Sequence, residues 1–128
     1  MVDFNFFITS NYRKLTHKKT FTFSAPSNIA LVKYWGKKDN QIPANPSLSF
    51  TLSNCKTITS LTFTAKETKG ISFDLLFEGQ PKESFRPKIQ KYFERILQYC
   101  PYIEDYHFTI DTQNTFPHSS GIASSASG

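Results

Sequence analysis

The segment from residue 25 to residue 37, APSNIALVKYWGK, concentrates cationic and aromatic side chains. Within five positions it places two lysines, a tyrosine and the single tryptophan of the chain, namely Lys33, Tyr34, Trp35 and Lys37. Gly36 allows the backbone to approach a ligand closely. This combination predicts a binding site for a polyanion. An aromatic pair in the core, flanked by two lysines with buried stems, is an alternative that the spacing leaves open.

A second segment, PHSSGIASSASG at 117–128, contains small side chains and hydroxyls. A Gly-Ser-rich turn that enters a helix presents free main-chain N–H groups at the positive end of the helix dipole, so it predicts a phosphate cradle. The segment lacks the lysine of a P-loop. A plain surface loop is the alternative. The candidate phosphate-binding residues are Pro117, Ser120, Gly121, Ile122, Ala123, Ser124 and Ser125.

Hydroxyl groups in the same segment suggest a role for magnesium. The hydroxyls of Ser120, Ser124 and Ser125 could reach phosphate or a bound Mg²⁺ ion, which prefers oxygen ligands. Ser124 is the candidate ligand. Ile122, Ala123 and Ala126 could pack a helix inward behind these hydroxyls, which favours the cradle over the loop.

The remaining ionisable side chains give weaker signals. Lys88 and Lys91 lie on the polar side of a predicted helix, where a solvated basic face explains both, so Lys88 is a secondary candidate for anion binding. The three histidines, His17, His107 and His118, have no acidic or cysteine partner at a telling spacing, which favours ordinary surface or satisfied histidines over a catalytic dyad. No acid–base pair is suggested by the acidic residues Asp74, Glu104, Asp105 and Asp111. We therefore expect no general base in this sequence.

Composition predicts one globular domain with an anionic partner. The 128 residues are 38% hydrophobic and 16% aromatic, which suffices for a core and excludes a disordered tail. A net charge of +5 and a pI near 9.3 suit a phosphorylated small molecule or nucleic acid. Lysine and aromatic residues interleave at only one place, so a nucleic-acid-binding domain is the less favoured alternative. Cys55 and Cys100 lack CxxC spacing, and we expect two reduced thiols.

The sequence contains no recognisable targeting or membrane segment. Its first twenty residues lack an unbroken apolar region with a cleavage site. No run of about 18 apolar residues occurs anywhere. We therefore expect a cytoplasmic protein without a membrane partner.

Hydrophobic periodicity predicts an α+β fold with helices on one face of a mixed sheet. Strands are predicted to start at Phe21–Phe23 and to cover 47–52, 57–64, 71–77 and 106–110. Helical spacing predicts one helix over 86–99, with Pro87 in its first turn and Pro101 after its end. A second helix is predicted to begin near Ser120. This second helix has no stop signal before Gly128, so we expect a piece of a longer protein.

The two motif-bearing segments together resemble the GHMP kinase superfamily and, within it, the diphosphomevalonate decarboxylase family. SAPSNIALVKYWGKKD at 24–39 and NPSLSFTL at 45–52 are similar to that family's N-terminal signature. NTFPHSSGIASSASG at 114–128 is similar to its phosphate loop. The resemblance covers residues 20–128. It implies a partial N-terminal domain of a two-domain α+β fold, truncated within the phosphate-loop helix, with residues 1–19 as an extension.

The resemblance implies an enzyme of the mevalonate pathway of isoprenoid biosynthesis. With ATP and Mg²⁺, the family converts mevalonate 5-diphosphate to isopentenyl diphosphate, ADP, phosphate and CO₂. By the resemblance, Lys33 lies beside the transferring phosphoryl group as a catalytic cation. Tyr34 and Lys37 contact the substrate diphosphate, and Trp35 and Lys88 complete the implied substrate site.

By the same resemblance, ATP phosphates are wrapped by Gly121, Ala123, Ser124 and Ser125. The catalytic aspartate and the carboxylate-binding arginine of the family would lie beyond Gly128, so the 128-residue chain alone is expected to be inactive. A homodimer of the full-length protein is compatible with the resemblance. A mevalonate-type kinase that does not decarboxylate is the alternative within the superfamily.

Overall fold

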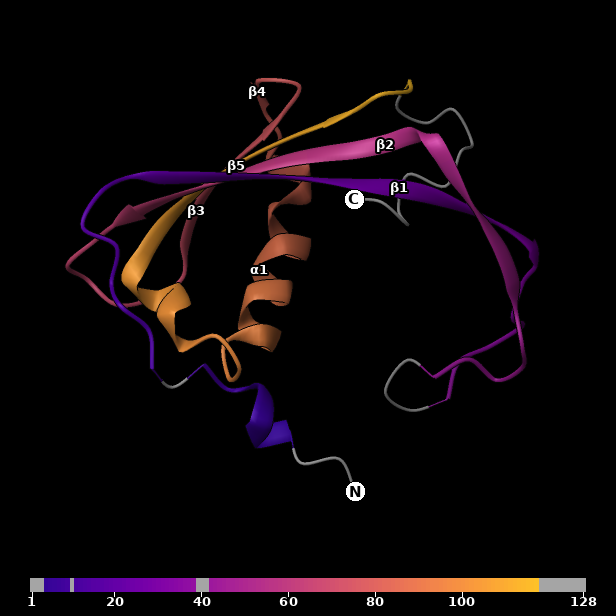
Figure 1. Ribbon diagram of the computed structural model, residues 1–128, viewed down its shortest axis with the longest axis horizontal. Helices are drawn as coiled ribbons and strands as arrows, with labels where there is room; N and C mark the ends of the chain where they lie inside the picture. The colour runs from indigo at the N-terminus through magenta and orange to yellow at the C-terminus, as the bar shows by residue number, and fades with distance from the viewer. Residues whose placement is uncertain (1–3, 10, 39–41, 118–128) are drawn as a thin grey trace. The chain divides into compact units, whose positions relative to one another are not determined.

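Figure 1 shows the computed structural model of the protein, which describes residues 4–9, 11–38 and 42–117. The elements follow in the order η1 (Phe4–Phe7), β1 (Lys19–Val32), β2 (Leu48–Ala65), β3 (Ser72–Phe77), β4 (Gln80–Pro81), η3 (Glu83–Phe85), α1 (Arg86–Ile96), η4 (Pro101–Asp105) and β5 (Tyr106–Asn114). The five strands form one sheet in the order β1-β2-β5-β3-β4. Strand β3 runs parallel to β5 and antiparallel to β4. The predicted α+β class with a mixed sheet is confirmed.

The chain divides into two compact units. The core unit comprises residues 1–22 and 59–112, and the loop unit comprises residues 23–58 and 113–128. The division falls within β1, β2 and β5, so each of these strands contributes to both units. Each unit is described separately below.

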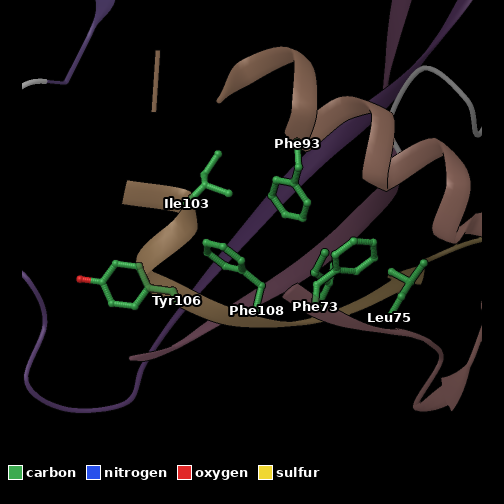
Figure 2. Close-up of a cluster of buried hydrophobic side chains, with 7 residues drawn as sticks. Phe73, Leu75, Phe93, Ile103, Tyr106 and Phe108 are labelled. Atoms are coloured by element: carbon green, nitrogen blue, oxygen red, sulfur yellow. The ribbon is translucent and has the colours of Figure 1, made fainter. Parts of the chain in front are cut away.

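Buried apolar side chains of the core unit form one cluster, which consists of Phe73, Leu75, Phe93, Ile103, Tyr106, Phe108 and Ile110. Alternate residues of β3 and β5 face this cluster because successive side chains of a strand point to opposite faces. The ring of Phe93 points from α1 toward Phe108 and Phe73 (Figure 2), with centroid distances of 5.3 and 5.4 Å. Helix α1 therefore covers one face of the sheet in the core unit.

Helix α1 begins where its sequence signals predict and ends earlier. Pro87 lies in the first turn, as expected. Arg86 Nη2 donates to the carbonyl of Phe73 at 3.0 Å, which ties the start of the helix to β3. The predicted end at residue 99 is wrong: the helix ends at Ile96, and Tyr99 N and Cys100 N both donate to Ile96 O in a turn ahead of Pro101. No helix among the described residues is long and apolar enough to cross a membrane.

The predicted break between two strands at residues 52–57 is wrong. The sequence predicts two strands there, but Leu48–Ala65 is a single strand. Main-chain groups of Lys56 and Asn54 are bonded to Thr115: Thr115 N donates to Lys56 O at 2.9 Å, and Thr115 Oγ1 donates to Asn54 O at 2.9 Å. Tertiary hydrogen bonds therefore hold a stretch extended that Ser53 and Asn54 alone would favour as a turn.

The hairpin from β3 to β4 was not predicted from the sequence. Its two central residues, Glu78 and Gly79, have φ of 53° and 75°, and Phe77 pairs with Gln80. Two consecutive left-handed residues are the backbone requirement of a two-residue type I′ hairpin. Strand β4 is only two residues long, too short for a periodic signal.

Residues before β1 pack within the core unit. Thr9 N donates to Tyr99 O at 2.9 Å, and Leu15 N donates to Tyr106 Oη at 2.7 Å. Leu15 also packs against the buried cluster. This part of the predicted extension therefore contributes to the core unit. The boundary at residue 19 stays a prediction.

Candidate functional site

The KYWGK motif lies in the segment between β1 and β2, residues 33–47, which we call the β1–β2 loop. Its described main chain is closed by two hydrogen bonds, from Lys38 N to Ile42 O at 2.8 Å and from Ala44 N to Gly36 O at 2.9 Å. Lys37 and Pro43 form an antiparallel bridge between them. The loop therefore has a defined backbone path on both of its described arms.

Asn45 joins the two ends of the β1–β2 loop. Its Oδ1 accepts a hydrogen bond from Trp35 N at 2.8 Å, and its Nδ2 donates to Pro46 O at 3.0 Å. Sequence analysis gave Asn45 no role. An Asn before a proline and close to a turn is the signal that could have found it, because its side chain readily bonds to nearby main chain.

Side chains of the motif point to solvent. Trp35 is 93% exposed and Tyr34 39% exposed, and Lys33 and Lys37 are also exposed. Lys37 Nζ lies 5.9 Å from the centroid of the Tyr34 ring, within the range of a cation–π contact. The alternative of a core aromatic pair is therefore wrong. The cation and the phenol lie together and can meet an external anion.

A side-chain hydrogen bond joins β1 and β2, the strands that lead into and out of the loop. Thr51 Oγ1 of β2 donates to Asn28 Oδ1 of β1 at 2.8 Å. Ser27 is completely buried next to Asn28. The two strands therefore stay paired close to the point where the chain leaves β1 for the KYWGK motif.

The other predicted site residues are placed only in part. Lys88 is exposed on α1 of the core unit, whereas the KYWGK motif belongs to the loop unit. Pro117 is exposed and follows the buried Phe116. The predicted second helix and most of the predicted phosphate loop lie outside the described residues, namely Ser120, Gly121, Ile122, Ala123, Ser124 and Ser125. The assembly of these groups into one site stays a prediction.

His107 is a hydrogen-bonded histidine, in agreement with the expectation of ordinary or satisfied histidines, and its acidic partner is distant in the sequence. In the parallel pairing of β3 with β5, Ser72 lies opposite His107. His107 Nδ1 lies 2.7 Å from Ser72 Oγ, and its Nε2 lies 3.1 Å from Asp74 Oδ2. The strand register creates this contact, and a separation of 33 residues hides it in the sequence.

Asp105 is a buried carboxylate of the core unit. It accepts hydrogen bonds from Lys69 Nζ and, at 2.7 Å, from Tyr12 Oη, and Lys14 Nζ lies 4.0 Å away. The hydrogen bonds from Lys69 and Tyr12 lower the pKa of the Asp105 carboxyl. The same bonds raise the pKa of Lys69 and of Tyr12. This cluster ties the N-terminal segment to η4 and is structural.

Metal-binding clusters are absent from the part of the chain that the structure describes. There, no three residues among His, Cys, Asp and Glu gather closely enough to hold a metal ion. Cys55 and Cys100 are both free, as expected from their spacing. The described site is thus a surface of ammonium, phenol and indole groups, which can bind an anion.

Comparison with known proteins assigns the family. The sequence model of the diphosphomevalonate decarboxylase-like N-terminal domain matches residues 25–128. The chain belongs to this family. The match contains the whole β1–β2 loop and begins within β1.

Relatives of this diphosphomevalonate decarboxylase-like domain include proteins of known structure. The diphosphomevalonate decarboxylase of Gibberella zeae is 35% identical over 119 residues, 82% of this chain and 31% of that protein. The solved mevalonate diphosphate decarboxylase of Enterococcus faecalis, studied for its mevalonate diphosphate mediated ATP binding, is 31% identical with a TM-score of 0.71, over 88% of this chain and 34% of that one. A solved complex of MDDEF with MVAPP, AMPPCP and magnesium is 31% identical with a TM-score of 0.68, over 88% and 34% of the two chains. The chain thus spans about a third of the length of these relatives.

Proposed function

We propose that this chain is the N-terminal part of an ATP-dependent decarboxylase. The full-length enzyme would convert mevalonate 5-diphosphate and ATP to isopentenyl diphosphate, ADP, phosphate and CO₂. The observation that carries the proposal is the exposed KYWGK motif on a closed loop, in a chain of the diphosphomevalonate decarboxylase-like family. The cofactors of the proposed reaction are ATP and Mg²⁺, in line with a relative solved with AMPPCP and magnesium.

In this proposal the β1–β2 loop binds the diphosphate of the substrate. The Lys37 ammonium lies over the Tyr34 ring, so the cation and the phenol hydroxyl can act on one phosphate group. Hydrogen bonds from a cation to phosphate are charge-assisted and are stronger than neutral ones. Trp35, which is almost fully exposed, can cover the hydrocarbon part of the substrate.

Lys33 has a different role in the proposal. It is the first residue of the β1–β2 loop and directly follows Val32, so the end of β1 fixes the position of its backbone. Its ammonium would offset the negative charge that develops on the transferring phosphoryl group. Lys88 would add a further cation for the diphosphate.

ATP supplies the phosphoryl group in the proposed reaction. We assign its phosphates to main-chain amides and hydroxyls of the predicted phosphate loop, with Ser124 as the residue nearest to Mg²⁺. This loop directly follows Phe116, which is buried at the end of the described chain.

The test of the proposed reaction is a product analysis of the full-length protein with mevalonate 5-diphosphate, ATP and Mg²⁺. We expect isopentenyl diphosphate and CO₂ in equal amounts, with one ADP formed per turnover. A stable phosphorylated product without CO₂ would instead identify the kinase alternative. Consumption of neither ATP nor substrate would reject the proposal.

Diphosphate binding can be tested on the 128-residue chain, because Trp35 is its only tryptophan. We expect mevalonate 5-diphosphate to change the Trp35 emission, and Lys37→Ala to weaken this binding by roughly tenfold. Lys91→Ala is the matched control, because Lys91 is an exposed lysine on α1 and should leave the affinity unchanged. Equal effects of the two variants would mean that only the net charge of the chain matters.

We also propose a cytoplasmic location. The two free thiols, Cys55 and Cys100, suit a reducing compartment. Fractionation of cells that express a tagged full-length protein would test this location, and recovery in an oxidising compartment would contradict it.

A further inference from the structure

We infer that Asn45 is a positioning residue for the diphosphate-binding side chains of the β1–β2 loop. It would act through the main chain of Trp35 and would not touch the substrate. The inference rests on the proposed function, which names the diphosphate ligand. The claim that Asn45 orders the loop can be tested without any ligand.

Main-chain hydrogen bonds close the part of the loop that follows Trp35, and a side-chain bond from Asn45 holds Trp35 itself. The bonds between Gly36 and Ala44 and between Lys38 and Ile42 close the part that follows Trp35. The bond from Trp35 N to Asn45 Oδ1 extends this closure by one residue toward β1. Asn45 therefore fixes the peptide unit between Tyr34 and Trp35, which lies between the strand and the closed part.

The position of this peptide unit decides where the candidate side chains point. The Tyr34 side chain leaves the backbone immediately before the bonded N–H group, and the Trp35 side chain leaves it immediately after. A rotation of this peptide would move the phenol away from the Lys37 ammonium, which now lies 5.9 Å from the ring centroid. A diphosphate requires the hydroxyl and the cation at the same time, so Asn45 would determine whether both can bind together.

Asparagine is well suited to this position. Its amide both accepts from Trp35 N and donates to Pro46 O, so both ends of the side chain are held. Pro46 restricts the backbone of Asn45 to extended conformations, which keeps its side chain directed across the loop. Aspartate would retain the acceptor and lose the donor, and alanine would lose both.

Loss of this contact should weaken diphosphate binding because the loop would be less ordered before the ligand binds. A loop that must be ordered when the ligand binds carries a cost that a preformed loop avoids. One hydrogen bond is worth about 1 kcal/mol, so Asn45→Ala should weaken binding by roughly five- to tenfold.

The first arm of the experiment measures the order of the loop in the 128-residue chain without ligand. With selective excitation of Trp35, fluorescence anisotropy decay should show larger indole motion in Asn45→Ala than in the wild type. Asn45→Asp should remain close to the wild type because it keeps the acceptor for Trp35 N. Gln98→Ala is the matched control, because Gln98 Nε2 donates to Arg95 O at 3.3 Å on the core unit. Unchanged indole motion in Asn45→Ala would overturn the inference.

The second arm titrates the same chains with mevalonate 5-diphosphate and with inorganic pyrophosphate. Asn45→Ala should weaken both ligands by a similar factor, whereas Gln98→Ala should leave both unchanged. Increased motion with unchanged affinity for a ligand that the wild type binds would overturn the positioning role. If the wild-type chain binds neither ligand, the assignment of diphosphate binding to this loop by itself fails, and increased motion in Asn45→Ala would still support Asn45 as the residue that orders the loop.

Discussion

Trp35 and Phe108 show how differently this chain uses its aromatic residues. Phe108 is 1% exposed and packs between Phe63 and Phe93, so it supplies hydrophobic stabilisation. Trp35 is 93% exposed, and its main chain is held by a hydrogen bond. An exposed, main-chain-anchored tryptophan beside lysines contributes little to folding and is available for recognition.

Lys33 should act mainly on the chemical step. We expect Lys33→Ala in the full-length protein to lower kcat by roughly 10²- to 10³-fold with a small change in KM, because a fixed cation stabilises charge that develops in the transition state. Steady-state kinetics measures this split. Lys38→Ala removes a neighbouring exposed lysine and should leave kcat unchanged. A raised KM at constant kcat would show that Lys33 contributes only to substrate binding.

Asp105 should stabilise the fold at neutral pH. Its pKa is lowered in the folded chain by Lys69 and Tyr12, so the folded state favours the ionised carboxylate. This stabilisation is present above the ordinary pKa of aspartate and is lost as pH falls through the lowered pKa. Asp105→Asn should therefore reduce the free energy of unfolding by about 2 kcal/mol at pH 7, with a smaller difference in strong acid.

Urea denaturation at several pH values tests the role of Asp105. Glu67→Gln removes an exposed carboxylate and should change the free energy of unfolding by less than about 0.5 kcal/mol. A constant difference between Asp105→Asn and the wild type down to acid pH would contradict the linkage.

Helix α1 is attached to the sheet through the buried Phe93, the partly buried Ile89 and Ile96, and the bond from Arg86 to Phe73 O. Phe93 is its one buried residue and contacts both β3 and β5, whereas the adjacent Tyr92 is 48% exposed. Phe93 is thus the centre of the apolar face of the helix, and its truncation should weaken the attachment most.

Phe93→Ala should lower the free energy of unfolding by about 3–5 kcal/mol, because it removes a buried aromatic ring and leaves a cavity. Tyr92→Ala on the same helix is the matched control and should cost less than about 1 kcal/mol. Denaturant midpoints monitored by far-UV circular dichroism compare the two variants. Similar midpoints would mean that α1 does not depend on the contact with Phe108.

The hairpin from β3 to β4 should depend on Gly79. Because Gly79 has a φ of 75°, a side chain there is strained, and Gly79→Ala should cost about 1–2 kcal/mol of stability. Gly36→Ala provides the control: a Cβ at Gly36 would lie 3.8 Å from Ala44 Cβ, which is ordinary contact. Thermal unfolding of both variants tests the difference, and an equal loss in both would contradict it.

The two units differ in how much apolar surface they bury. Among the described residues, the seven-residue cluster lies wholly in the core unit, whereas the loop unit has one buried apolar side chain, Phe116. Local opening should therefore require less free energy in the loop unit.

Hydrogen exchange can test this difference directly. We expect the slowest amide exchange in β3 and in the first half of β5, around Leu75 and Phe108, and faster exchange at Trp35 and Ala44. Exchange measured residue by residue with NMR would show the order. Equal protection of the two units would mean that they unfold together.

Local patterns in the sequence predicted those parts of the structure that depend on neighbouring residues. The alternation around Phe73 and Phe108 predicted β3 and β5, and the spacing from Ile89 to Cys100 predicted α1. Contacts between distant residues could not be predicted: the bonds of Thr115 that keep β2 continuous, and the pairing of His107 with Asp74, depend on strand register.

The candidate site was predicted to a similar extent. The KYWGK side chains were selected as a candidate site from their types and spacing, and the structure shows them exposed; their role in binding stays a prediction. Asn45 was missed because its role lies in a side-chain bond to the main chain of Trp35, ten residues earlier. Composition and periodicity do not encode such a contact.

The position of β5 in the sheet has a consequence for biosynthesis. Strand β5 lies between β2 and β3, although it is the last of the five strands to leave the ribosome. A nascent chain can form the β3–β4 hairpin early, but β2 and β3 have no partner along their shared side until residues 106–114 emerge. Unpaired strand edges attract other chains. Newly made copies of this protein should therefore depend on chaperones, or on slow translation, until their central strand is complete.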